Sequence, residues 1–220
     1  MKKMILLLIL LVFAISNVVG QVKFPSKEEF YLEIGKANDK GNKLPRRETN
    51  TTKFLDSGRK VEKIFTRISE IITDKKKRTI EITEEKNKLT ERSENILIGE
   101  MEYTQKDQGN WMKKDLSKVD AIKGQFRITG ESQEIKKLNE YIISTSVVDN
   151  KKQSVYYNCD VSLRDNILYF FETKYWINED GLIFKSQIAQ RNTTPDGLIE
   201  LTDIIYEYNP KDLKIEAPIK

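Results

Sequence analysis

The C-terminal residues 168–220 carry the pattern that most restricts what this chain can fold into. Three groups of turn-forming residues divide this stretch into four runs: NEDG at 178–181, TPDG at 194–197 and NPKD at 209–212. Glycine tolerates positive φ, proline presets φ, and Asn and Asp side chains bond their own backbone, so each group favours a chain reversal. We therefore expect an antiparallel meander over these residues.

The first of these runs alternates strictly between two sets of side chains. The odd-numbered residues from Tyr169 to Ile177 point one way, and the residues from Phe170 to Asn178 point the other. Such a period of two predicts a strand with one buried face and one solvated face. Residues 213–217 repeat the pattern and predict a fourth strand. We expect the buried face to continue across most of the molecule.

The rest of the chain also favours strands joined by short turns. Residues 115–139 leave helix, short strand and loop open, and Gly99 predicts a bulge or bend within its strand. The chain has no internal repeat and no low-complexity linker. The fold class predicted is mainly β with few helices: a curved antiparallel sheet or open half-barrel in a single domain. The strands are expected at 48–55, 60–73, 78–85, 95–105, 111–113, and in a hairpin of 141–148 with 153–161.

One helix is expected within residues 24–47. Ser26 is a natural N-cap, Glu29 completes a capping box, and Gly41 and Pro45 end the helix. We expect this helix to pack on the concave face of the sheet, in preference to binding a partner. Its apolar stripe has the spacing i, i+4, i+7 and consists of Phe30, Ile34 and Ala37.

The N-terminus has the features of a secretory signal peptide. Lys2 and Lys3 precede an unbroken apolar stretch at 4–15, which is too short to span a bilayer as a helix. We expect residues 1–20 to be removed by cleavage after Gly20, leaving residues 21–220 as one exported domain. No cysteine follows the apolar stretch, so a bacterial lipid-anchor site is not expected. An uncleaved membrane anchor is the alternative.

Composition removes several kinds of site. The sequence has no histidine and a single cysteine, Cys159, which excludes Ser-His-Asp and Cys-His catalysis and the usual zinc sites. It has neither a P-loop nor a G-x-G-x-x-G motif, so no catalytic residue, metal or cofactor is predicted. A pair of carboxylates for glycoside cleavage stays open. The formal charge of +4 falls to +2 without Lys2 and Lys3, which argues against a nucleic-acid partner.

Large apolar side chains gather in the C-terminal runs and form the candidate ligand-binding face. They serve either as an ordinary core closed by loops or as the wall of a ligand cavity, and the residues alone leave both open. The candidate residues are Tyr169, Phe171, Tyr175, Ile177, Phe184, Ile204 and Tyr206, with Phe30, Ile34 and Ala37 as candidates for a helical lid.

Three segments resemble the periplasmic lipoprotein-carrier family, the LolA/LolB-like half-barrels. They are residues 94–103 leading to Trp111, the hairpin at 175–182, and residues 204–210. The resemblance implies a curved antiparallel sheet with helices in its mouth, around an apolar hollow that holds acyl chains. This chain departs from the family in having few clear helices between residues 115 and 140. No functional residue of the family is matched to a position here.

Two functions therefore stand side by side. The first is a periplasmic, non-enzymatic carrier that binds a lipid or lipoprotein acyl chain and meets other envelope proteins. The second is an exported structural or interaction module whose sheet is filled by its own side chains. A histidine-free hydrolase that uses carboxylates ranks third. One observation distinguishes the first two functions: a carrier should have an empty apolar cavity of roughly several hundred Å³ beneath the sheet, and a filled module should not.

Overall fold

A computed structural model describes residues 22–56, 58, 60–86, 88–118, 140–148, 151–164, 167–192 and 199–219. The predicted signal peptide and the interpretations for residues 119–139 lie outside these ranges. No helix within them combines the length and apolar character that crossing a membrane requires.

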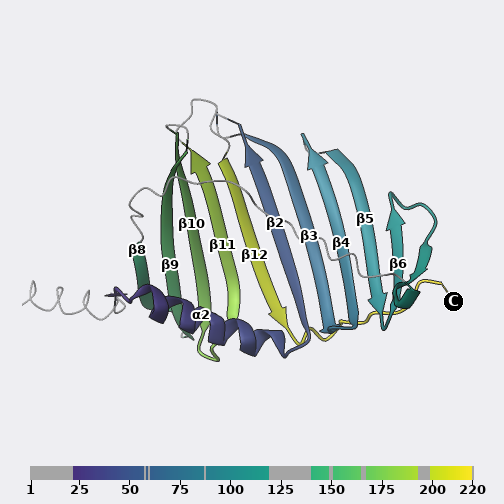
Figure 1. Cartoon of the computed structure of the whole chain (residues 1–220), viewed down its shortest axis with the longest axis horizontal. Coiled ribbons are helices and arrows are strands. Elements are labelled where there is room, and N and C mark those ends of the chain that lie inside the picture. The colour runs from purple at the N-terminus through teal and green to yellow at the C-terminus, as the bar shows by residue number, and fades with distance from the viewer. Residues whose placement is uncertain are drawn as a thin grey trace, which may run out of the picture.

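Twelve strands form one antiparallel sheet, in the order β1-β8-β9-β10-β11-β12-β2-β3-β4-β5-β6-β7 (Figure 1). The sheet is not closed, because β1 and β7 remain as its edges, so the predicted open, mainly β fold is confirmed. The strands are β1 (Val22–Lys23), β2 (Arg46–Leu55), β3 (Val61–Thr73), β4 (Lys76–Glu85), β5 (Lys88–Ile98), β6 (Met101–Lys106), β7 (Met112–Asp115), β8 (Glu140–Val148), β9 (Lys151–Arg164), β10 (Ile167–Asn178), β11 (Ile183–Asn192) and β12 (Ile199–Tyr208), and a 3₁₀ turn, η1 (Leu116–Lys118), follows β7.

Two meanders make up this sheet, and they join between β12 and β2. Strands β2 to β7 follow one another in space, and so do β8 to β12. The junction is a ladder that runs from Tyr208 beside Arg46 to Ile199 beside Leu55. The C-terminal meander predicted from the turn residues therefore lies near the middle of the sheet.

The turns test the predictions made from glycine and asparagine. The reversal at 178–181 is confirmed: Gly181 has φ 70°, and the Leu182 N–H donates to Asn178 Oδ1 at 2.9 Å. At Gly99, with φ 64°, the prediction of a bulge or bend within one strand is wrong, since the chain reverses there and Ile98 pairs with Met101. Glycine suits the first central position of such a two-residue hairpin.

Helix α2 (Lys27–Asn42) begins with the predicted capping box. The Glu29 N–H donates to Ser26 Oγ at 3.2 Å, and the Ser26 N–H donates to Glu29 Oε2 at 3.0 Å. The predicted stripe of Phe30, Ile34 and Ala37 is the buried side of the helix. The helix crosses the strand ends of β8 to β12 (Figure 1) and contacts β8 and β11.

The ladder register assigns each strand residue to one of two faces, because cross-strand partners share a face. Ser186 pairs with Tyr175 on one side and Ile204 on the other. These residues lie on the side that α2 covers, which we call the helix face. Glu207 points the opposite way from Tyr206, as does its partner Arg47. The C-terminal residues 209–219 cross that side like a strap (Figure 1), and we call it the strap face.

Each half of the sheet buries apolar side chains on a different face. The cluster on the helix face involves β9, β10, β11 and α2. On β5 and β6 the buried Ile96 and Tyr103 lie instead on the strap face, where Ile215 from the C-terminal tail packs on them. The expectation of one dry face across the molecule is therefore wrong. Residues 213–217 are also not a strand, and their alternation serves to bury Ile215 against the sheet.

Two glycines of α2 provide a matched test of how closely the helix approaches the sheet. A Cβ at Gly41 would lie 2.6 Å from Tyr208 Oη, and that hydroxyl is held because it donates to the Ile183 carbonyl at 2.8 Å. A Cβ at Gly35 would meet no atom within 4 Å apart from its chain neighbours and the backbone of its own helix. In urea titrations we expect Gly41→Ala to lower the free energy of unfolding by about 1–3 kcal/mol. Gly35→Ala should raise it by about 0.5–1 kcal/mol. Equal effects would contradict the close approach.

Candidate functional site

The candidate site is the apolar contact between α2 and the helix face. Phe30 has no exposed surface, and its ring centroid lies 5.1 Å from that of Tyr141 and 5.8 Å from that of Tyr156. Lys40 at the C-terminal end of the helix also donates to the Asp180 carbonyl. We call the contact the aromatic cluster; it comprises Phe30, Ile34, Ala37, Tyr156, Ile177 and Ile183, with Tyr141, Ile143, Tyr175 and Tyr206 partly buried around them.

The structure brings together some of the predicted site residues. The three lid candidates of α2 meet Ile177, Tyr175 and Tyr206 in the aromatic cluster. Ile204 shares the helix face with them, because it pairs with Ser186. These positions place the sequence-predicted residues against one another, from one helix and two strands.

Other predicted residues lie outside the aromatic cluster. Tyr169 and Phe171 continue the helix face along β10, and Phe171 is 40% exposed. Phe184 sits at a register irregularity, since Lys185 pairs with Trp176 and Ile183 pairs with Ile177. The side chain that packs under α2 from this turn is therefore Ile183, which is 1% exposed.

The sequence interpretation missed the contribution of β8 and β9. Tyr156 and Tyr141 enter the aromatic cluster because β9 pairs with β10, which places Tyr156 beside Tyr175. The hairpin itself was predicted, but its position next to β10 was not. Alternation gave no signal for Tyr156, because its face of β9 also carries Ser154, Asn158 and Asp160.

Tyrosine hydroxyls border the aromatic cluster, and their environment keeps them neutral. Burial raises the pKa of Tyr31 and of Tyr208 to about 12 in each case. Burial also raises the pKa of Tyr156, Tyr175 and Tyr206. The border of the cluster therefore offers uncharged hydrogen-bonding groups.

A row of buried polar side chains adjoins the aromatic cluster on the helix face. On β9 and β10 it lies two residues from Tyr156 and Tyr175, a shift of about 6.7 Å, and on β11 Ile188 takes the same position in the register. Thr52 and Thr202 share a hydrogen bond of 2.9 Å between their hydroxyls. The face thus passes from apolar to polar within the length of an amphiphilic molecule. The buried members of the row are Asn158, Thr173, Thr202 and Thr52, and Ser186 stands between the row and the cluster.

The hollows described in the structure lie elsewhere, between residues of mostly polar type. One of about 440 Å³ is lined mainly by hydroxyl, amide and charged side chains of β4 to β7, among them Thr79, Ser93 and Asn95. Another of about 270 Å³ adjoins it and includes Phe65 and Thr83. Over the aromatic cluster, by contrast, the side chains of α2 occupy the space. The aromatic cluster is therefore closed by the helix in this structure.

The described residues contain no group of three or more Cys, Asp or Glu side chains placed to hold a metal ion. Cys159 is a free, half-buried thiol on β9.

Comparisons with known proteins find likeness only in structure. No family model matches the sequence, and no curated protein matches it. A LolA superfamily protein from Nitrosomonas europaea is similar over 82% of this chain and 96% of its own, with 7% identity and a TM-score of 0.30. A structure described as an outer membrane lipoprotein-sorting protein domain, from Vibrio parahaemolyticus, covers 88% of this chain and 94% of its own, with 8% identity and a TM-score of 0.28.

A DUF1329 family protein from Desulfovibrio piger is also similar, over 90% of this chain and 96% of its own, with 10% identity and a TM-score of 0.27. The resemblance to LolA-like proteins stated from the sequence is thus met again among solved structures. All three TM-scores are below 0.5, so any inference about function depends on the residues of this chain alone.

Proposed function

We propose that the protein is an exported, non-enzymatic carrier that binds an amphiphile with an acyl chain, such as a lipid or a lipoprotein, between α2 and the helix face. The observation that carries the proposal is the aromatic cluster itself. An open sheet presents Tyr175, Ile177 and Tyr206 to a single amphipathic helix, which holds them with three apolar side chains. The helix is the lid, and the acyl chain takes its place on the sheet.

The chemistry of the helix face supports an amphiphilic ligand. The aromatic cluster suits an apolar chain, which is stabilised by about 25 cal/mol for each Å² of apolar surface removed from water. The adjoining polar row, with Thr173 and Thr202, supplies hydroxyl groups for an ester or amide head. We further propose a periplasmic location and exchange of the ligand with other envelope proteins.

The closed aromatic cluster supports a second candidate, an interaction module with a filled core. Phe30 is fully buried and Ile183 is 1% exposed, so the contact is complete without a ligand. The two candidates differ in what happens when the lid is weakened. A carrier binds its ligand only when the lid is open, so its apparent affinity is proportional to the fraction of molecules with an open lid. Weakening the lid raises that fraction and therefore the affinity. A filled core only loses stability.

Replacing Ile34 with alanine tests the carrier directly. Ile34 is 4% exposed in the aromatic cluster, so the variant weakens the closed lid by about 2–5 kcal/mol. We expect the affinity for the fluorescent fatty acid cis-parinaric acid to rise about tenfold or more. The measurement is a fluorescence titration of the purified protein, at a concentration where the probe forms no micelles.

The matched control is Leu32→Ala on the same helix. Leu32 is 57% exposed and lies outside the aromatic cluster, so its removal should leave the probe affinity unchanged. If the wild type and both variants fail to bind the probe while Ile34→Ala is less stable, the carrier is rejected and the filled core stands. Mass spectrometry of protein from its native host adds a second readout, since a carrier copurifies with lipid.

A further inference from the structure

The C-terminal residues 209–219, which we call the strap, follow a defined path across the strap face. Figure 1 shows the strap leaving the end of β12 and running past the ends of β2 to β5 toward β6. Its start is a turn, in which Asn209 has φ 51° and donates its N–H to the Pro45 carbonyl at 2.7 Å. The Leu213 N–H then donates to the Pro210 carbonyl at 3.2 Å. This turn sets the direction in which the strap leaves the sheet.

Two side chains of the strap make its main contacts with the sheet. Asp212 Oδ2 accepts a hydrogen bond of 2.9 Å from Arg47 Nη2. Ile215, three residues later, is 2% exposed and packs on Ile96 and Tyr103. No strand pairing between the strap and the sheet occurs in the described part of the chain. Beyond the turn at Asn209, the strap is therefore held mainly by one carboxylate and one aliphatic side chain.

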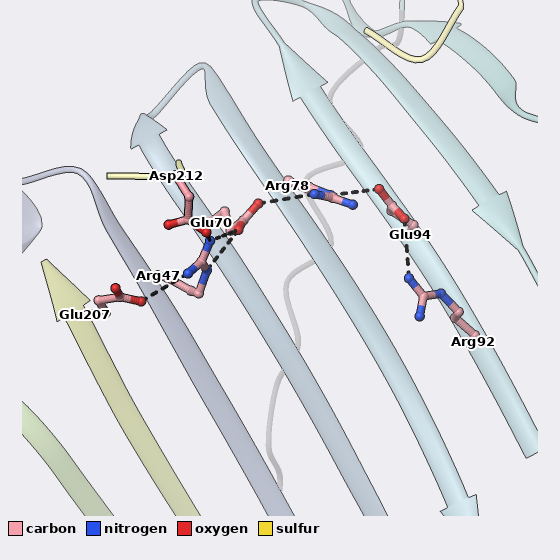
Figure 2. A network of polar contacts seen from close by, with 7 residues as sticks. All are labelled: Arg47, Glu70, Arg78, Arg92, Glu94, Glu207 and Asp212. Atoms are coloured by element: carbon pink, nitrogen blue, oxygen red, sulfur yellow. Dashed lines mark hydrogen bonds and ion pairs between the residues drawn. The ribbon is translucent and has the colours of Figure 1, made fainter. Parts of the chain in front are cut away.

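The carboxylate end of this site is organised without the strap. Figure 2 shows Arg47 between Glu207 and Glu70, in a row that continues to Arg78 and Glu94. Arg47 Nε and Nη2 donate to Glu70 Oε1 at 2.9 and 2.8 Å, and Nη1 donates to Glu207 at 3.1 Å. None of these three bonds involves the strap, so we expect the guanidinium to be in place for an incoming carboxylate.

The apolar end is likewise built from the sheet. Ile96 and Tyr103 are cross-strand partners on β5 and β6. With Ile215 removed, these side chains would form the floor of an open apolar pocket. The remaining members of its wall are partly buried: Ile72, Ile98, Met101 and Trp111.

We propose that this part of the strap face is a docking site for an extended peptide of another protein, one that carries a carboxylate and, three residues later, a branched aliphatic side chain. The strap occupies the site in the free protein and competes with that partner. The site goes beyond the lipid-carrier proposal and does not depend on it, because the aromatic cluster lies on the other face. A second copy of the chain is a poorer occupant, because the turn at Asn209 already directs each strap onto its own sheet.

A peptide titration tests the proposal. The emptied protein is the full chain with Asp212→Asn and Ile215→Asp, and the probe is a fluorescein-labelled peptide of residues 209–219. We expect a Kd on the order of 100 µM by fluorescence anisotropy. Wild-type protein should bind the peptide at least about tenfold more weakly, since its tethered strap competes at an effective concentration in the millimolar range.

Changes in the peptide provide controls that cannot affect folding of the protein. A peptide that keeps only the Asp and Ile positions, with alanine elsewhere, should bind like the original. A peptide with Asn at the Asp position should bind several-fold more weakly. A peptide with Ser at the Ile position should bind at least about tenfold more weakly. Equal binding of all these peptides would overturn the proposal.

Other outcomes also decide the matter. An emptied protein that folds but binds no peptide overturns the proposal. If it does not fold, Ile215→Ala is the milder replacement, and failure of both variants to fold would make the strap an integral part of the core. A wild-type chain that forms dimers, lost in the Ile215→Ala variant, would assign the site to a second copy instead of a foreign peptide.

Discussion

Replacing Phe30 with alanine is expected to lower the hydrogen-exchange protection of α2 by about 100-fold or more, while β2 to β5 keep theirs. Phe30 is fully buried against Tyr141 and Tyr156, and truncating such a side chain costs about 3–5 kcal/mol. Because Phe30, Ile34 and Ala37 supply the buried apolar side chains of α2, the loss should appear as local opening of the helix. Hydrogen exchange followed by mass spectrometry resolves the helix peptides from the strand peptides.

The same experiment separates a lid from a core element. Leu32→Ala, at a 57% exposed position of α2, should leave all protection within about threefold of the wild type. Loss of protection in β2 to β5 together with α2 would mean that helix and sheet unfold as one unit. That outcome would favour the filled-core module over the carrier, since a lid must open without unfolding the sheet that receives the ligand.

Local chemistry explains why much of the fold was predictable. Ser26 and Glu29 lie three residues apart, and their reciprocal bonds start α2 where the pattern predicted. The turn at Gly181 needs positive φ, which few residues tolerate. Alternation along β10 is likewise a property of the single strand. These features give element type, chain reversals and the mainly β class.

Pairing between distant strands lies beyond such local signals. The ladder of β12 with β2 joins residues about 150 positions apart, as in the bond between Thr52 and Thr202, and no turn connects them. A shift of one residue in a ladder turns the apolar side chains to the opposite face. The sequence therefore shows that Ile96 and Ile98 lie on the same side of their strand. It does not show that this side faces away from Tyr175.

The candidate site was predictable to the same extent. Tyr175, Ile177 and Phe30 could be chosen because each lies on the apolar side of its own element. Ile183 and Phe184 are adjacent, and only the register irregularity decides that Ile183 is the one beneath α2. The strap was the larger omission, because the alternation around Ile215 resembles a strand although the chain there pairs with none of the described strands.

Arg47→Ala should produce the largest loss of stability outside the aromatic cluster, about 3–5 kcal/mol in urea unfolding. Arg47 is the main partner of Glu70, which is 7% exposed and, among the described residues, keeps Arg78 at 3.5 Å as its remaining ion-pair partner when Arg47 is gone. A buried carboxylate that loses the two hydrogen bonds Arg47 donates to its Oε1 keeps the cost of leaving water. The variant also removes the bond that holds Asp212 of the strap.

Two further variants identify the source of this loss. Arg67 pairs with Glu81 through side chains that are 50% and 36% exposed, so Arg67→Ala should cost less than about 1 kcal/mol. Adding Glu70→Leu to Arg47→Ala removes the stranded carboxylate and should recover most of the stability, because an apolar replacement of a buried pair is often neutral. If the double variant is as unstable as Arg47→Ala, the loss comes from the released strap. If Arg47→Ala costs no more than Arg67→Ala, the charged row across β12, β2, β3 and β4 contributes little to the fold.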